Sequence, residues 1–239
     1  LLPNVRQNLM FSATFSREIK SLAQGILNHP AQIDVSPGKA TVEAIIQSVF
    51  KVDRARKSEL LIKLIIEGEW KQVLVFTRTK HGANNLCKKM INFSINARAI
   101  HGNKSQTART AALTGFKDGS VNVLVATDIA ARGIDIPLLP HVVNFELPNI
   151  PEDYVHRIGR TGRAGSNGRA ISLVSVDEYA YLEDIEKLIK LKISSSIPKG
   201  FELDPKIIPA PDKKKKNSSQ KKSNKRFGKS RNNKKRFKR

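Results

Sequence analysis

Three arginines recur at three-residue spacing in a glycine-rich stretch of the sequence: Arg157, Arg160 and Arg163. Guanidinium groups keep their charge at neutral pH and make forked contacts that match phosphate oxygens. Interspersed glycines let the backbone come close to a bound anion. On composition alone, a basic surface turn is the default interpretation of such a stretch. A phosphate-binding site therefore needs support from neighbouring motifs.

An apolar run, Val123–Ala126, leads directly into a polar segment. Ligands of open α/β sheets bind outside the carboxyl ends of the strands, so we expect Thr127, Arg132 and Asp135 to face a ligand. Two alternatives stay open at this position: Asp128 could cap a helix, and Asp135 could form a structural salt bridge.

A second apolar run, Val73–Phe76, leads into hydroxyl and basic side chains at 77–80. Such groups at a strand end suit contacts with a sugar-phosphate backbone. Both runs are continuously apolar, as expected of strands that are covered on both faces. We therefore expect this strand end to contact nucleic acid.

A parallel sheet would position these side chains, and the alternation of short apolar runs with amphipathic segments predicts one. The expected fold class is α/β, a doubly wound parallel sheet with helices on both faces. A helix after Lys80 should bury an apolar stripe that includes Cys87, and Ser175 with Glu178 has the spacing of a capping box that opens a last helix. The predicted strands are Ile45–Val52, Gln72–Thr77, Ala97–His101, Asn122–Ala126, His141–Phe145 and Ala170–Val174.

The chain is expected to have three parts: residues 1–40, the sheet domain at 41–205 and a tail at 206–239. A Ser-Pro-Gly-Lys break at 36–39 separates the first two parts. The tail has too few apolar residues to fold alone and is predicted to be disordered. Residues 1–40 are predicted to contain a strand at Asn8–Phe11, a helix from about Ser16 and a strand at Gln32–Val35.

Positive charge is concentrated in the tail. The chain has 43 Lys and Arg against 21 Asp and Glu, a net charge of +22, and residues 213–239 hold 15 of the basic residues and no acidic one. This charge calls for a polyanionic partner, either nucleic acid or an acidic membrane surface. No stretch approaches the roughly 18 apolar residues of a membrane span. Cys87 is the only cysteine, so no intrachain disulfide is possible and a cytoplasmic location fits best.

Five short motifs occur in order along the chain: Ser12–Thr14, Val75–Arg78, Gln106–Arg109, residues 127–135 and Tyr154–Arg163. They resemble motifs III, IV, Q-x-x-R, V and VI of the DEAD-box family of superfamily 2 RNA helicases. The resemblance implies a RecA-like helicase C-terminal domain at 41–205, preceded by a remnant of the first RecA-like domain. Residues 101–106 and 147–154 most resemble the bacterial RhlE-type branch.

The resemblance also implies roles for single residues. Arg160 and Arg163 would be catalytic arginine fingers that stabilise charge on the γ-phosphate of ATP. The fingers and the RNA-facing residues are expected at adjacent strand ends of one sheet. ATP would be contacted by Gly133 and Asp135, and the RNA backbone by Thr77, Arg78, Arg109, Thr127 and Arg132. Interdomain coupling would involve Ser12, Thr14, Asp128, His156 and Arg157.

ATP and Mg²⁺ are the cofactors that the resemblance implies, yet the sequence contains no G-x-x-x-x-G-K-[ST] phosphate loop and no Asp-Glu-Ala-Asp box. In the family both lie in the first RecA-like domain, on the N-terminal side of Ser12. We therefore interpret the chain as the C-terminal part of an ATP-dependent RNA helicase that starts within a longer protein. Alone it should be inactive, because nothing in it holds the triphosphate.

Alternatives to this interpretation come from other functional classes. The chain could be a stand-alone RNA-binding or annealing module, or a basic structural protein of a ribonucleoprotein particle. The tail is expected to bind RNA by releasing counterions, with Phe227 and Phe237 stacking on bases. A solubilising tail without a partner is the alternative. Ribosomal or RNA-decay assemblies are the expected larger partners, and no membrane is expected.

Overall fold

A computed structural model describes residues 3, 5–12, 17–33, 45–131, 136, 139–162 and 168–206. The chain divides into two compact units, Leu1–Pro209 and Ala210–Arg239. The predicted domain boundary near residue 40 and nearly all of the predicted tail lie outside the described residues. All structural statements below concern the first unit.

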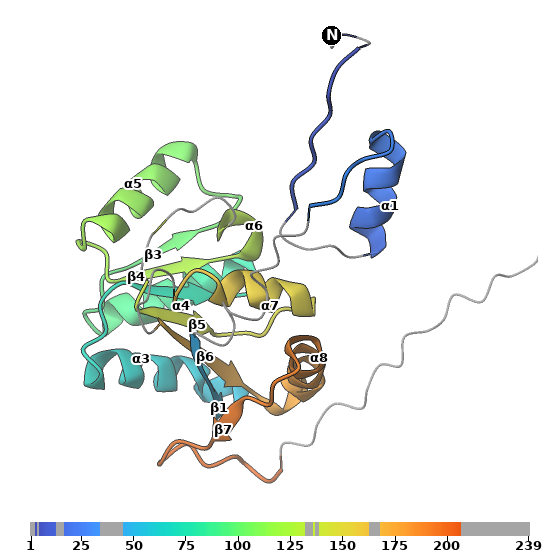
Figure 1. The fold of residues 1–239 in the computed structure, drawn as a ribbon. Helices are drawn as coiled ribbons and strands as arrows, with labels where there is room; N and C mark the ends of the chain where they lie inside the picture. The colour runs from blue at the N-terminus through green and yellow to red at the C-terminus, as the bar shows by residue number, and fades with distance from the viewer. Residues whose placement is uncertain are drawn as a thin grey trace, which may run out of the picture. The chain divides into compact units, whose positions relative to one another are not determined.

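The described residues form a parallel sheet of seven strands in the order β3-β4-β2-β5-β6-β1-β7 (Figure 1). Every pairing between neighbouring strands is parallel. The α/β prediction is therefore confirmed, and each of the six predicted strands is present. The strands are β1 (Ile45–Lys51), β2 (Val73–Phe76), β3 (Ala97–Ile100), β4 (Val123–Ala126), β5 (His141–Asn144), β6 (Gly168–Val174) and β7 (Ser194–Ser196).

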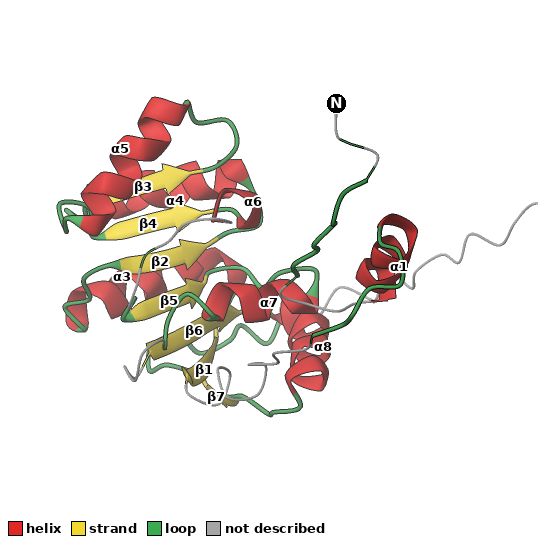
Figure 2. Ribbon diagram, turned by 45° about the horizontal axis from the view of Figure 1, so that its top comes forward, coloured by secondary structure: helices red, strands yellow, loops and turns green. Residues whose placement is uncertain are grey.

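Helices cover both faces of the sheet (Figure 2). One face packs against α3 and α4, and the other packs against α5, α6, α7 and α8. Short 3₁₀ turns at Arg54–Arg56 and Val176–Glu178 precede α3 and α8. The helices are α1 (Arg17–Ile26), α3 (Lys57–Glu67), α4 (Lys80–Asn92), α5 (Gln106–Lys117), α6 (Asp128–Ala131), α7 (Pro151–Ile158) and α8 (Tyr179–Ile189).

Strand β2 shows why the central strands are apolar throughout. Val73 and Val75 belong to the core cluster under α3 and α4, whereas Leu74 and Phe76 belong to the cluster under α5 and α6. All four side chains are at most 2% exposed. Burial of each such side chain stabilises the fold by about 1.5–3 kcal/mol. The strand thus fixes the position of the polar residues that follow it.

Helix α4 begins at the cap residue Thr79, whose side chain accepts a 3.0 Å hydrogen bond from the backbone N–H of Gly82. Its predicted apolar stripe is confirmed for Ala83, Leu86, Cys87 and Met90, which are buried, whereas Ile91 is 49% exposed. Burial raises the pKa of the Cys87 thiol to about 12. Cys87 is therefore a packing residue and not a reactive thiolate.

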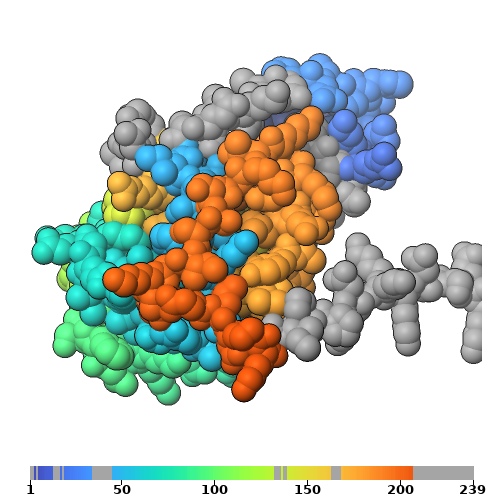
Figure 3. Space-filling model, turned by 90° about the horizontal axis from the view of Figure 1, so that it is seen from below, coloured from blue at the N-terminus to red at the C-terminus, as the bar shows by residue number. Residues whose placement is uncertain are grey.

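The capping box of Ser175 and Glu178 is confirmed, but it closes a 3₁₀ turn that leads into α8. On α8, Leu182 and Ile185 pack into the core, whereas Leu188 is 41% exposed. It is the last helix of the described residues, and β7 follows it and pairs with β1. In Figure 3 the chain after α8, in deep orange, lies beside the blue residues of β1 and α3.

The N-terminal segment differs in part from the prediction. The predicted strand at Asn8–Phe11 is wrong: these residues form no strand, and Phe11 is 89% exposed. The predicted helix is confirmed as α1. Residues 32 and 33 form no strand, and the rest of the predicted strand Gln32–Val35 lies outside the described residues. No helix in the described part of the chain is long and apolar enough to cross a membrane.

Candidate functional site

The carboxyl end of β2 presents three consecutive residues with different surroundings. Thr77 is fully buried, and its hydroxyl donates a 3.3 Å hydrogen bond to the carbonyl oxygen of Thr79. Arg78 is partly buried, and Thr79 is exposed at the start of α4. Of these residues, Thr79 is the one whose side chain is open to a ligand, although the sequence singled out Thr77 and Arg78.

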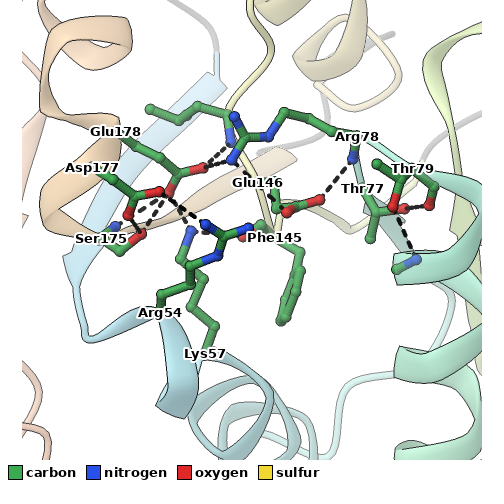
Figure 4. A network of polar contacts seen from close by, with 12 residues as sticks. Arg54, Lys57, Thr77, Arg78, Thr79, Phe145, Glu146, Ser175, Asp177 and Glu178 are labelled. Atoms are coloured by element: carbon green, nitrogen blue, oxygen red, sulfur yellow. Dashed lines mark hydrogen bonds and ion pairs between the residues drawn. The ribbon is translucent and has the colours of Figure 1, made fainter. Parts of the chain in front are cut away.

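Arg78 is held by acceptors of its own domain, as Figure 4 shows. Its backbone N–H donates a 2.8 Å hydrogen bond to Glu146 Oε2, and its Nη2 donates a 3.3 Å hydrogen bond to Glu178 Oε1. The guanidinium also lies 5.7 Å from the ring centroid of Tyr181. The side chain of Arg78 is 21% exposed. Its positive charge is thus largely matched within the domain.

Glu178 is a fully buried carboxylate at which four segments of the chain meet (Figure 4). It forms an ion pair with Lys57 of α3 and accepts hydrogen bonds from Arg78 and from the backbone N–H groups of Leu147 and Ser175, at 3.0 Å and 3.2 Å for the last two. Burial lowers the pKa of the Lys57 ammonium, and the Glu178 carboxylate opposes that shift. The cluster therefore keeps two charges inside the domain by pairing them.

Arg157 of α7 forms a second buried cluster and is 1% exposed. Its Nε and Nη2 donate to the two carboxylate oxygens of Asp128, at 2.6 Å and 2.9 Å, which is the forked geometry of an arginine–carboxylate pair. Nη1 donates to Asn144 Oδ1 at 3.1 Å and to the carbonyl oxygen of Glu146 at 2.7 Å. Asp128 and Arg157 thus join the end of β4 to α7 within one domain.

The carboxyl end of α7 lies near the amino end of β5. The hydroxyl of Thr161 donates to the carbonyl oxygen of Leu139, and these two residues form a parallel bridge just before β5 begins. Arg160 therefore lies near the amino end of β5, whereas Arg78 lies at the carboxyl end of β2. The expectation that the fingers and RNA-facing residues occupy adjacent strand ends is wrong, because α7 runs back along the sheet between them.

Three more predicted residues lie near the ends of β3 and β4 or on α7. Thr127 directly follows β4, and its backbone N–H donates to the carbonyl oxygen of Ile100 at 3.3 Å. Arg109 lies in the first turn of α5, and its Nε is buried without a hydrogen-bond partner among the described residues. His156 Nδ1 lies 3.6 Å from Asp153 Oδ1. The carboxyl ends of the strands together form what we call the carboxyl edge of the sheet. The end of β4 and the start of α5 thus bring Thr127 and Arg109 to this edge, on the side of β3.

Five of the predicted site residues lie outside the described residues: Thr14, Arg132, Gly133, Asp135 and Arg163. Ser12 lies within the described residues. Within the described ranges, no group of three or more His, Cys, Asp or Glu side chains could hold a metal ion. The described residues therefore do not by themselves fit a Mg²⁺ site.

Comparisons with known proteins agree with the parallel α/β fold. Residues 56–165 match the model of the helicase conserved C-terminal domain. The structure resembles the E. coli DEAD-box protein SrmB, solved bound to the regulator of ribonuclease activity A, with a TM-score of 0.64 and 36% identity over 70% of this chain and 98% of that one. The chain belongs to the DEAD-box family of RNA helicases.

Other DEAD-box relatives show how much of such a protein this chain represents. RhlB of Pseudomonas syringae pv. tomato is 38% identical over 81% of this chain and 49% of its own length, and CshA of Geobacillus kaustophilus is 40% identical over 82% and 42%. S. cerevisiae Dbp5, solved with RNA and ADP BeF3, matches with a TM-score of 0.75 and 31% identity over 82% of this chain and 52% of that one. The chain spans about half the length of these DEAD-box relatives and covers their C-terminal domain region.

Sequence reasoning missed the acidic residues that organise this DEAD-box domain. Glu146 and Glu178 hold Arg78, and Lys57 neutralises Glu178. No short motif marks Lys57 and Glu178 as partners, because 121 positions separate them in the chain. One signal is present in the sequence: Ser175 and Glu178 have the spacing of a capping box, and a carboxylate in that position has a second oxygen that can accept from other segments.

Proposed function

We propose that the full-length protein is an ATP-dependent RNA helicase that locally unwinds or remodels RNA duplexes, and that this chain supplies its arginine fingers and part of its RNA-binding surface. The observation that carries the proposal is the pair of Asp128 and Arg157, whose two hydrogen bonds join the first part of motif V to α7 of motif VI. Membership of the DEAD-box family supports the same activity.

The arginines of this domain would stabilise negative charge on the nucleotide. Bound Mg²⁺-ATP would supply the phosphoryl group that is transferred to water, and the first RecA-like domain would hold it. Arg160 and Arg163 would donate to the γ-phosphate oxygens as charge develops on them. Asp128 fixes Arg157, which lies one turn before Arg160, so the finger is presented from an anchored helix. Gly133 and Asp135 would contact the nucleotide.

RNA would lie along the carboxyl edge of the sheet, where Thr79, Thr127 and Arg109 are brought to the strand ends. Support comes from the structure of the relative Dbp5, which was solved bound to RNA and ADP BeF3. Contacts with a sugar-phosphate backbone carry no sequence information. We therefore propose binding of RNA without sequence preference, with Arg132 and the basic tail adding positive charge.

Replacing Arg160 by Ala in the full-length protein tests the proposal. RNA-stimulated ATP hydrolysis should fall by about 10³-fold or more, because arginine fingers in related phosphoryl-transfer enzymes contribute that much. Arg169→Ala is the matched control. Arg169 is exposed on β6, so this substitution removes the same charge outside the motif. Equal turnover of the wild type and Arg160→Ala would refute the finger assignment.

Deletion of residues 212–239 tests the tail. Loss of phosphate contacts should flatten the dependence of RNA affinity on salt, because each neutralised phosphate of a single strand contributes about 0.7 to that slope. An unchanged slope would identify the segment as a solubilising tail.

A stand-alone RNA-binding or annealing module remains the second candidate, because contacts with a sugar-phosphate backbone at the carboxyl ends of the strands need no nucleotide. ATP crosslinking to the full-length protein separates the two. We further propose a cytoplasmic location and a role in ribosome assembly or RNA decay. Assignment to the RhlE-type branch stays a prediction, since the relatives named above are RhlB and CshA.

A further inference from the structure

Glu146 contacts both α7 and the end of β2, and Figure 4 shows its contact with Arg78 at the end of β2. Its carbonyl oxygen accepts a 2.7 Å hydrogen bond from Arg157 Nη1. Its carboxylate accepts a 2.8 Å hydrogen bond from the backbone N–H of Arg78 and lies 3.8 Å from the Arg78 guanidinium. One residue thus contacts both the helix that leads to Arg160 and the strand end that leads to Thr79.

The partners of Arg78 favour a role different from the phosphate contact expected from the sequence. Two carboxylates, Glu146 and Glu178, already face its guanidinium, and Nη1 lies 3.4 Å from Asn149 Oδ1. A phosphate that approached Arg78 would have to displace these acceptors. Thr79 has no such competition, because its exposed hydroxyl contacts only the backbone around α4 among the contacts described.

We propose that Glu146 is a positioning residue: by holding Arg78 as an internal strut, it fixes the RNA-facing strand end at 77–79 relative to α7. RNA bound at this edge and ATP bound at the fingers would then influence one another through Glu146. The proposal rests on the proposed helicase function, because RNA and ATP define the two sides that it joins.

The two roles of Arg78 predict opposite effects of one substitution. If Arg78 bound phosphate, Glu146 would compete with RNA for the guanidinium, and Glu146→Gln would tighten RNA binding. If Arg78 is a strut, Glu146→Gln weakens the contact that holds Arg78 at the strand end. The coupling between RNA binding and nucleotide binding should then fall. Glutamine keeps an oxygen that can accept the Arg78 N–H, so the variant removes the charge while preserving the shape.

The experiment measures the affinity of the full-length protein for a single-stranded oligoribonucleotide, with and without a non-hydrolysable ATP analogue, over a series of KCl concentrations. Glu146→Gln and Arg78→Met should each reduce the factor by which the analogue tightens RNA binding by about fivefold or more. The salt slope should not change. The double variant should lose no more than either single variant, because both remove the same interaction.

Glu67→Gln is the matched control, because it removes the same charge from an exposed position on α3. It should behave as the wild type. A partly misfolded variant would lower the number of active molecules equally with and without nucleotide, so the ratio of the two affinities reports positioning and not loss of folded protein.

Three results would overturn the positioning role while leaving the helicase function standing. These are tighter RNA binding by Glu146→Gln, a salt slope lowered by about 0.7–1 in Arg78→Met, and a coupling factor for Glu146→Gln equal to that of Glu67→Gln. A wild-type protein whose ATP hydrolysis does not respond to RNA would instead overturn the helicase function, and the coupling role with it.

Discussion

The carboxyl ends and the amino ends of the strands are stabilised by different kinds of contact. At the carboxyl edge, charged side chains enter the domain and are matched by opposite charges, as Lys57 is by Glu178 and Arg157 by Asp128. At the amino edge, Trp70 stacks on His141 with ring centroids 4.4 Å apart. This pair of rings is held by packing and contains no ion pair.

The difference shows where the domain contains buried ion pairs, which stable packing does not require. Buried ion pairs are costly to desolvate and are often no more stable than apolar replacements. The clusters around Glu178 and Arg157 lie at the carboxyl ends of the strands, where we propose that RNA binds. The three predictions below test this contrast from the largest expected effect to the smallest.

Lys57→Met should be the most damaging of the three changes, because it leaves the Glu178 carboxylate buried without its cation. We expect a loss of about 3–5 kcal/mol in the free energy of unfolding, measured by urea unfolding of the 239-residue chain. Lys63→Met on the same helix is the control, since Lys63 is 44% exposed; it should change stability by no more than about 0.5 kcal/mol. Equal effects of both changes would contradict the contrast between the edges.

Arg157→Lys keeps the charge but removes the forked contact with Asp128. One ammonium cannot reach both carboxylate oxygens, Asn144 and the Glu146 carbonyl at once, so stability should fall by about 1.5–3 kcal/mol. RNA-stimulated ATP hydrolysis of the full-length protein should fall as well, because α7 carries Arg160. Urea unfolding and a steady-state ATPase assay check the two effects. A fully active Arg157→Lys protein would show that point charge, and not geometry, is what this edge requires.

His141→Phe at the amino edge should have the smallest effect. Burial lowers the pKa of His141, so the unfolded chain takes up a proton first as the pH falls below about 6.5, and the wild type loses stability there. Phenylalanine keeps the stack with Trp70 and does not titrate. Between pH 7 and pH 5 the variant should lose less stability than the wild type, by below about 1 kcal/mol.

Urea midpoints measured across this pH range give the difference, and RNA-stimulated ATP hydrolysis should match that of the wild type. A steeper pH dependence in the variant would mean that protonated His141 stabilises the fold, which contradicts a stack of two neutral rings.

The fold was predictable because its determinants are local. Short β-branched runs such as Val73–Phe76 favour a strand buried on both faces, and the stripe on α4 follows from helical spacing. The short strand β7 could not be foreseen: Ser194–Ser196 has no apolar residue, and its pairing with β1 makes it a strand. The predicted strand at Asn8–Phe11 failed for the converse reason, since apolar residues form no strand without a partner.

The candidate site was predictable only at the level of segments. Motif positions correctly indicated the ends of β2 and β4, because a polar segment after an apolar run marks a strand end. Which side chain faces outward depends on packing, so the buried hydroxyl of Thr77 could not be distinguished from the exposed one of Thr79. Pairs such as Lys57 with Glu178 join residues far apart in sequence, and no local pattern reveals them.

The place of β1 within the sheet has a consequence for synthesis on the ribosome. Its neighbours are β6 and β7, and Ile45 pairs with Gly168, roughly 120 residues later in the chain. At translation rates of about 5–20 residues per second, β1 waits about 6–24 s for a partner. During that time its apolar side chains are exposed in the nascent chain, while β2, β3 and β4 can already assemble. The strand of this sheet that comes first in the sequence is therefore among the last to be protected, and a chaperone that binds nascent apolar segments should contact residues 45–51.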